Sequence, residues 1–322
     1  MRGTTKFGLM ILALAVVLMG AGTASAAAIK VAVVAPSASN DLAFTQSIID
    51  GINALKKERP IELAVTDGTF VVADAAAAIR AYAKKGFDLV IAHGSQYGGS
   101  LKEIAKDFPK TAFAWGTSAD TFGLPNVSSY EAASNEGGYV MGAMAAALSK
   151  KKVIGIVGPI EVGDAKLYVD GFAAGAKAHN PKVRVNVNYI GSFSDVALSA
   201  EAARAFMATG ADVLTGTAQM VVGAIGAARS KKAAWFGTQA NQTSLAPEIV
   251  VANQVYKWEV ILRQILADRD KGILGGKMYK INLKNGGLVI EYNNAYKLPK
   301  GVKGVGQNAI AQIKTGAVKM AD

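Results

Sequence analysis

The sequence of 322 residues contains no cysteine and only two histidines, His93 and His179. Disulfides, thiol chemistry and cysteine-based zinc sites are therefore excluded, and neither histidine belongs to an H-E-x-x-H pattern or another metal motif. The phosphate-loop, dinucleotide and G-x-S-x-G signatures are missing as well. We accordingly expect no metal, no cofactor and no catalytic residue.

Long hydrophobic runs are also scarce, and the clearest one lies near the N-terminus at residues 9–19. It follows two basic residues and precedes the small residues 24–26, a pattern typical of a secretory signal peptide. The run is shorter than the roughly 20 residues that a membrane-spanning helix needs. Residues 1–26 are thus predicted to be a signal peptide. Because no cysteine can carry a lipid, we expect a periplasmic protein that is not lipidated.

Downstream, short runs rich in Val, Ile and aromatic residues alternate with helical patterns. Most of the runs are too continuous for one-sided antiparallel strands, which alternate polar and apolar residues, so they predict buried parallel strands. The predicted strands span residues 30–35, 61–65, 88–92, 111–115, 153–157, 183–190, 212–215 and 233–237. The predicted helices span residues 44–57, 72–84, 101–108, 135–148, 164–179, 197–207 and 221–228. This alternation predicts an α/β fold.

The roughly 295 residues after the signal peptide exceed the size at which a single core keeps growing. A turn-rich passage follows the fourth predicted strand, and the strand–helix cycle then restarts near residue 151. We therefore predict two doubly wound parallel-sheet lobes joined by a multi-crossing hinge near Ser128–Ser129 and residues 253–256. The predicted lobe 1 comprises residues 27–128 and about 256–272, and lobe 2 comprises residues 129–255 and about 273–322.

The charge is strongly positive, with 35 Lys and Arg against 24 Asp and Glu. A basic balance raises nucleic acid as a partner. The lysines are, however, scattered or gathered at turns, without an arginine-rich helix or interleaved aromatic residues. A solvated surface is the better interpretation, so we expect no nucleic-acid partner and a monomer.

Aromatic residues make up only 7% of the chain, and two of them follow predicted strands. Phe44 opens the helix that Asp41 would cap, and Phe193 lies in the polar turn at residues 191–195. Each phenylalanine alone would more often be core, but the pair favours an aromatic clamp for a planar ligand. His93 follows another strand, at the edge where open α/β sheets bind ligands. It is either a ligand contact or a plain turn residue.

Four segments resemble one family in order and spacing. Residues 41–46 (D-L-A-F-T-Q) are similar to its D-K-S-F-N-Q, and residues 135–142 (N-E-G-G-Y-V-M-G) to its E-G-S-Y-L-A-G. Residues 171–175 match G-F-x-x-G, and residues 189–195 (Y-I-G-S-F-S-D) look like its Y-x-G-S-F-x-D. These motifs resemble the basic membrane protein (BMP, PnrA-like) family of solute-binding proteins, which has the type I periplasmic binding protein fold.

The resemblance implies delivery of a small-molecule ligand to an ABC permease, with purine nucleosides as the best-known ligands. It further implies that Phe44 and Phe193 sandwich the base and that Thr45 occupies the position of a base-contacting Asn. Gln239 and Asn241 stand where the family has aspartates that bind ribose.

Other family positions also differ. Further family aspartates fall near Ala35 and Thr117, and a family lysine aligns with either Tyr256 or Lys257. Amides offer a donor and an acceptor together, which suits the edge of a nucleobase. Two further aromatic residues, Trp115 and Trp258, are either additional ligand surface or core.

The sequence thus predicts a periplasmic solute-binding protein of an ABC importer with a purine-type ligand. The ligand could be a nucleobase, an oxidised purine or a nucleoside. The predicted ligand-binding residues are Phe44, Thr45, His93, Trp115, Thr117, Phe193, Gln239, Asn241, Tyr256 and Trp258. The alternatives are an exported nucleoside-processing enzyme and a sensory ligand-binding protein.

Overall fold

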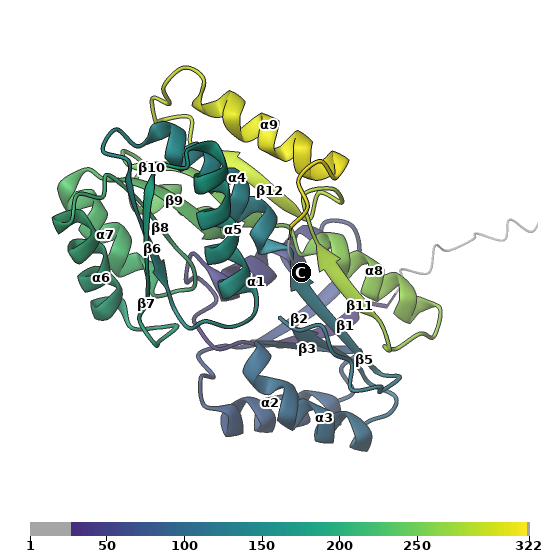
Figure 1. The fold of residues 1–322 in the computed structure, drawn as a ribbon. Coiled ribbons are helices and arrows are strands. Elements are labelled where there is room, and N and C mark those ends of the chain that lie inside the picture. Colours follow the sequence, from purple (N-terminus) through teal and green to yellow (C-terminus); the bar gives the residue numbers. More distant parts are fainter. Residues whose placement is uncertain (1–26, 321–322) are drawn as a thin grey trace, which may run out of the picture.

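The computed structural model describes residues 27–320, and the predicted signal peptide at residues 1–26 lies outside them. Two six-stranded sheets form two lobes, with the strand orders β11-β5-β4-β3-β1-β2 and β12-β10-β9-β8-β6-β7 (Figure 1). Neighbouring strands run parallel except β10 and β12, which are antiparallel. The predicted α/β class is therefore confirmed.

The first sheet is covered by helices on both faces. Val31 and Val33 of β1 pack in the cluster that contains α1 and α8, whereas Ala32 and Val34 pack in the cluster that contains α2 and α3. Burial on both faces explains why the strand is continuously apolar. The strands of this lobe are β1 (Ile29–Val34), β2 (Ile61–Thr66), β3 (Leu89–His93), β4 (Ala112–Gly116), β5 (Val127–Ala132) and β11 (Met278–Ile281). Its helices are α1 (Phe44–Leu55), α2 (Val72–Lys84), α3 (Gly98–Asp107) and α8 (Glu259–Asp270).

The second lobe repeats this architecture. Helices α6 and α7 cover one face of the sheet, and α4, α5 and α9 pack in the cluster on the other. Its strands are β6 (Val153–Gly158), β7 (Arg184–Tyr189), β8 (Val213–Gly216), β9 (Ala234–Gln239), β10 (Val250–Tyr256) and β12 (Leu288–Tyr292). Its helices are α4 (Ser134–Leu148), α5 (Gly163–His179), α6 (Val196–Ala208), α7 (Val221–Lys231) and α9 (Val302–Thr315).

Helices α4 and α5 touch through glycines. A Cβ atom added at Gly142 would lie 2.0 Å from the Phe172 carbonyl oxygen, and one at Gly175 would lie 2.0 Å from that of Tyr139. Both distances are far below van der Waals contact, so the backbones approach closely only because these side chains are missing. Two of the family-like glycine segments therefore serve helix packing.

The chain crosses between the lobes three times, after β5, after β10 and between β11 and β12. Backbone hydrogen bonds join the crossing segments to one another. The Ala133 N–H donates to the Ile281 carbonyl at 2.8 Å, and the Lys257 N–H donates to the Gly287 carbonyl at 2.7 Å. Three adjacent crossing segments thus connect the lobes.

The sheets divide the chain differently from the predicted ranges. β5 pairs with β4, so Ser128 and Ser129 lie inside a strand of the first sheet and the chain leaves that sheet only after Ala132. β11 pairs with β5, so residues 278–281 also belong to the first sheet and not to the second. The turn-rich residues before β5 and the serines within it concealed this strand in the sequence.

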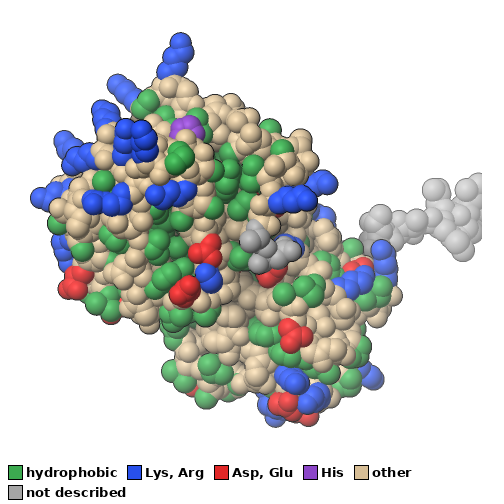
Figure 2. Space-filling view, viewed as in Figure 1, with side chains coloured by type: hydrophobic (Ala, Val, Ile, Leu, Met, Phe, Trp, Pro, Cys, Tyr) green, Lys and Arg blue, Asp and Glu red, His purple; other side chains and the backbone are tan. Residues whose placement is uncertain are grey.

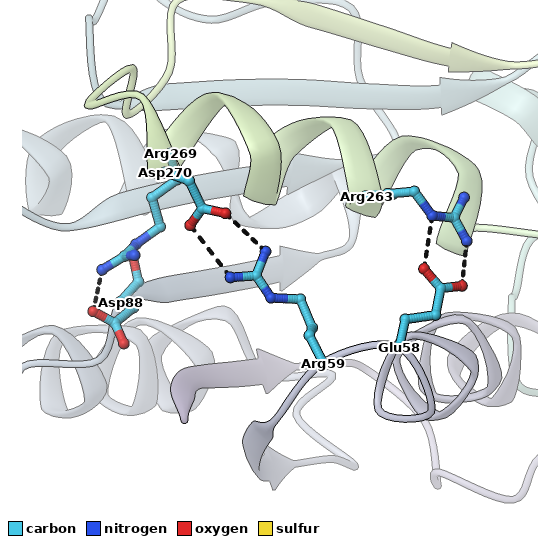
Figure 3. A network of polar contacts seen from close by, with 6 residues as sticks. All are labelled: Glu58, Arg59, Asp88, Arg263, Arg269 and Asp270. Carbon is cyan, nitrogen blue, oxygen red and sulfur yellow. Dashed lines mark hydrogen bonds and ion pairs between the residues drawn. The ribbon is translucent and has the colours of Figure 1, made fainter. Parts of the chain in front are cut away.

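Helix α8 returns the chain to the first lobe and is fixed there by a buried tryptophan. The Trp258 indole N–H donates to the Ser47 hydroxyl of α1 at 2.9 Å, and the ring is fully buried. Three ion pairs along α8 also join it to the first lobe at the surface, namely Arg263–Glu58, Arg59–Asp270 and Arg269–Asp88 (Figure 3). Exposed pairs contribute about 0–1 kcal/mol each, so the buried aromatic packing dominates. Within residues 27–320, no helix is both long and apolar enough to cross a membrane.

Candidate functional site: a cleft between the lobes

A cleft with about 480 Å³ of free space, including space open to solvent, lies between the lobes. It is lined by loops and helix starts that follow the carboxyl ends of the parallel strands, where open α/β sheets bind ligands. The first lobe contributes Pro36, Phe44, Phe70, Ser95, Gln96 and Thr117. The second contributes Val162, Gly163, Asp164, Ala165, Phe193, Ala218, Gln219 and Gln239.

Phe44 is held in place at the start of α1. The Asp41 carboxylate accepts backbone N–H groups from Ala43 at 2.9 Å and from Thr45 and Gln46 at 3.1 Å, which confirms the predicted cap. The Phe44 ring is 9% exposed. Its position is therefore set by the backbone around it before any ligand arrives.

His93 lies behind Phe44 and does not line the cleft. The two rings stack with centroids 4.0 Å apart at 18°. The fully buried His93 donates from Nε2 to the Phe44 carbonyl at 3.1 Å, and its Nδ1 accepts from the Tyr130 hydroxyl at 2.7 Å. Burial lowers the pKa of His93 to about 3, so the ring is neutral. The predicted direct ligand contact is thus corrected: His93 supports the aromatic wall from behind.

Phe193 lines the cleft from the opposite lobe, in the loop between β7 and α6. Its carbonyl accepts the Met220 N–H at 3.0 Å, and the Ser192 hydroxyl accepts the Asp195 N–H at 3.1 Å. The Asp195 carboxylate in turn caps α6 through the Leu198 N–H at 2.9 Å. The phenylalanine stays partly exposed. Both phenylalanines that the sequence singled out therefore line one cleft.

Asp164 is the main lining residue that the sequence interpretation missed. It lies in the first turn of α5, and its carbonyl accepts from the Ser134 hydroxyl at 2.6 Å. The Tyr256 hydroxyl donates to the Oδ2 atom of Asp164 at the long distance of 3.5 Å. Burial raises the pKa of Asp164 to about 6. The cleft therefore contains a carboxylate, although the family-like acidic positions are amides.

Phe70 was missed as well, although one feature of the sequence could have identified both Asp164 and Phe70. Asp164 and Phe70 each follow a predicted strand, the same position that identified Phe44 and Phe193. An aspartate in a first helical turn is, however, also favoured by the helix dipole alone. That ordinary explanation concealed its place in the cleft.

Gln239 ends β9 in a strained backbone conformation. Its φ of 72° lies in the left-handed region, as does the φ of 71° at Ala218 after β8. Such residues cost of the order of 1–3 kcal/mol each and cluster at functional sites. The Gln239 side chain is 3% exposed, and its Oε1 atom has no hydrogen-bond partner among residues 27–320. A residue with a strained backbone and an unsatisfied buried acceptor thus lines the cleft.

Two more predicted site residues of the first lobe lie outside the lining. Thr45 is fully buried, with its hydroxyl 2.7 Å from that of Ser37. Trp115 packs under the loops, where its indole donates to the Gly94 carbonyl at 3.1 Å and stacks on Phe122. Thr117 of the same segment does line the cleft.

The remaining predicted residues lie near the crossings. Asn241 donates to Glu291 at 2.8 Å, and Lys257 pairs with the same carboxylate at 2.9 Å. Tyr256 is buried behind Asp164, and Trp258 is core. None of the four is part of the cleft lining. Of the ten predicted residues, Phe44, Thr117, Phe193 and Gln239 line the cleft.

Comparison with known proteins places this cleft in a family context. The model of the Bmp family, described as ABC transporter substrate-binding protein PnrA-like, matches residues 28–318. A purine-binding protein of Brucella abortus is 30% identical over 249 residues, which cover 76% of this chain and 68% of the relative. A nucleoside-binding protein of an ABC transporter from Lactococcus lactis is 27% identical over 303 residues, covering 87% and 84%.

The fold is also similar to that of solved ABC transporter solute-binding proteins. An ABC transporter solute-binding protein from Conexibacter woesei superimposes with a TM-score of 0.77 at 24% identity, over 91% of this chain and 99% of that one. This likeness supports the periplasmic binding protein fold that the sequence predicted. The chain belongs to the PnrA-like family of ABC transporter substrate-binding proteins.

Proposed function

We propose that the protein is the periplasmic component of an ABC importer and binds an uncharged, planar, purine-type ligand. The observation that carries this proposal is that Phe44 and Phe193, from opposite lobes, line one cleft together with amide and hydroxyl side chains. Stacking on an aromatic side chain contributes about 1–3 kcal/mol per base. The names of the Brucella and Lactococcus relatives point to the same ligand class.

The charges of the cleft favour a ligand without an anionic group. Among the described lining residues Asp164 is the only ionisable side chain, and none is Lys or Arg. The basic side chains are spread over the outer surface, many of them on the second lobe (Figure 2). A phosphate or an amino-acid carboxylate would enter the cleft without a cation to pair with, at a cost in desolvation. Nucleobases and nucleosides carry no such group.

Closure of the lobes would couple ligand binding to transport. The three crossing segments near residues 133, 257 and 282–287 are the places where the backbone can rotate, in place of the predicted hinge at Ser128–Ser129. A ligand between Phe44 and Phe193 contacts both lobes and therefore stabilises the closed form. The permease would then recognise that form.

The enzymatic alternative is less well supported. Hydrolysis or phosphorolysis of a nucleoside needs a pair of acid–base groups or a metal. The described cleft lining offers one ionisable side chain for such work. We propose a binding protein that acts as a monomer and needs neither cofactor nor nucleic acid.

Calorimetry on the purified protein tests the ligand class. The panel comprises hypoxanthine, xanthine, guanine, inosine, ribose, glutamate and inosine monophosphate. We expect tight binding to at least one base or nucleoside and none to the last three. Tight binding to ribose or glutamate alone would refute the proposal. Chromatography after incubation with inosine tests catalysis, since released hypoxanthine would show an enzyme. Uptake of the bound purine should be lost in a deletion strain if the protein serves an importer.

A further inference from the structure

Two side chains of the second lobe that carry hydrogen-bond acceptors, Gln239 and Asp164, line the cleft. The Gln239 Oε1 atom is buried without a partner in the described part of the chain. The partly exposed Asp164 carboxylate accepts from the backbone N–H groups of Asp164 and Ala165, and from the Tyr256 hydroxyl at the long distance of 3.5 Å. Leaving a buried acceptor without a donor is costly. A donor group of a ligand would satisfy the Gln239 oxygen, and a second one would add a hydrogen bond to the Asp164 carboxylate.

The two acceptors come from neighbouring elements. Tyr256, the partner of Asp164, is the last residue of β10. The preceding residue, Val255, lies opposite Gln239 in the parallel pairing of β10 with β9. Asp164 and Gln239 thus approach the cleft from the same end of the second sheet.

Purine chemistry separates the roles of these acceptors. The lactam edge of an oxidised purine presents a carbonyl beside an N–H, which an amide such as that of Gln239 can match with its own donor and acceptor. The imidazole ring of a free base carries a further N–H that suits a carboxylate, because charge-assisted hydrogen bonds are the stronger ones. A nucleoside has lost that N–H to the glycosidic bond.

We infer that Asp164 accepts the imidazole N–H of a free purine base while Gln239 reads the lactam edge, so that the cleft prefers nucleobases to nucleosides. This inference rests on the proposed function and specifies its ligand. The ribose hydroxyls are also donors, but a nucleoside would need partners for all of them beyond those for its base.

The carboxylate must be ionised to accept the N–H, so affinity should fall in acid. Lys166 lies on the same helix as Asp164 and pairs with Glu161 and Asp170. From the elements packed against Asp164, the titratable side chains facing it are Tyr256 of β10 and Glu131 of β5. Burial holds the pKa of Asp164 near 6 without ligand. Binding should therefore weaken about tenfold between pH 7.5 and pH 5.

The decisive experiment measures hypoxanthine, 9-methylhypoxanthine and inosine by calorimetry. The methyl derivative keeps the lactam and loses the imidazole N–H. We expect hypoxanthine to bind at least tenfold more tightly than the other two. Asp164→Asn should weaken hypoxanthine about tenfold or more, leave 9-methylhypoxanthine nearly unchanged and abolish the pH dependence. Asp170→Asn, on the exposed side of the same helix, is the matched control and should behave as the wild type.

Several outcomes would overturn the inference. Inosine binding as tightly as hypoxanthine would do so, as would an Asp164→Asn variant that weakens both bases equally or neither. Gln239→Ala should weaken hypoxanthine and 9-methylhypoxanthine alike, since both keep the lactam, and an unchanged affinity would remove Gln239 from the pair. If the wild type binds nucleosides but no free base, this inference fails and the proposed function stands. If it binds no purine, the proposed function fails.

Discussion

Removing the Phe193 ring should separate ligand binding from folding more cleanly than removing the Phe44 ring. Phe193 lies partly exposed in a loop whose backbone is held by Met220 and Ser192. The Phe193→Ala substitution leaves those contacts intact. Phe44 is nearly buried against His93, so the same substitution there would also open a cavity in the core.

The expected loss of binding affinity follows from the loss of stacking on one aromatic ring. Stacking of a base on an aromatic side chain contributes about 1–3 kcal/mol by alanine substitution. At about 1.4 kcal/mol per tenfold change, Phe193→Ala should weaken purine binding roughly 5-fold to 150-fold. The free energy of unfolding should change by less than about 1 kcal/mol, because the side chain leaves no enclosed cavity.

Calorimetry gives the dissociation constant and urea unfolding without ligand gives the stability. Phe122→Ala is the matched control, since Phe122 is also partly exposed and stacks on Trp115 at 4.7 Å outside the cleft. The control should bind as the wild type. An unchanged affinity of Phe193→Ala, or equal losses in both variants, would refute the aromatic clamp.

Further substitutions test packing and electrostatics. Gly175→Ala should lower the free energy of unfolding by about 1–3 kcal/mol, because the added methyl group would clash with α4. Gly226→Ala should raise it by about 0.5–1 kcal/mol, because Gly226 of α7 faces open space. Urea unfolding measures both changes. His93 has a pKa of about 3 when folded and 6.5 when unfolded. Because the unfolded chain is protonated more readily, the free energy of unfolding of the wild type should fall by about 2 kcal/mol between pH 7 and pH 5. The His93→Gln variant should lack this decrease. Asp164 has its pKa raised by burial, so its ionised form destabilises the fold, and Asp164→Asn should raise the melting temperature at pH 7.5.

Six of the eight strands that the sequence predicted are almost wholly buried, and the other two, β2 and β7, are partly exposed strands at sheet edges. β1 and β3 read as continuous apolar runs because helices cover the sheet on each side. β11 and β12, the partly buried strands at the opposite edges of the two sheets, were not predicted. Helix α9 was also missed, because glycine and polar residues interrupt its apolar face.

The site was predictable to the extent that strand ends determine it. The rule that ligands bind beyond the carboxyl ends of strands found Phe44 and Phe193, whereas Gln239 was predicted from the family resemblance. It could not decide which neighbouring residues face the cleft. Trp115 and His93 were therefore predicted to line the cleft, although both lie behind its lining. That choice depends on the contacts behind the lining, such as the stack of His93 on Phe44, which sequence spacing does not encode.

The two aromatic walls are built differently, and this difference favours an order of binding. Phe44 is backed by His93 and then Tyr130 in one buried stack, so its position exists before the ligand arrives. Phe193 lies on a loop of the other lobe and is partly exposed. A ligand that first stacks on Phe44 loses little free energy to reorganisation, and closure then adds the second ring and the Asp164 acceptor together. Recognition of the ligand's hydrogen-bonding edge would thus coincide with closure, the step that a permease can detect.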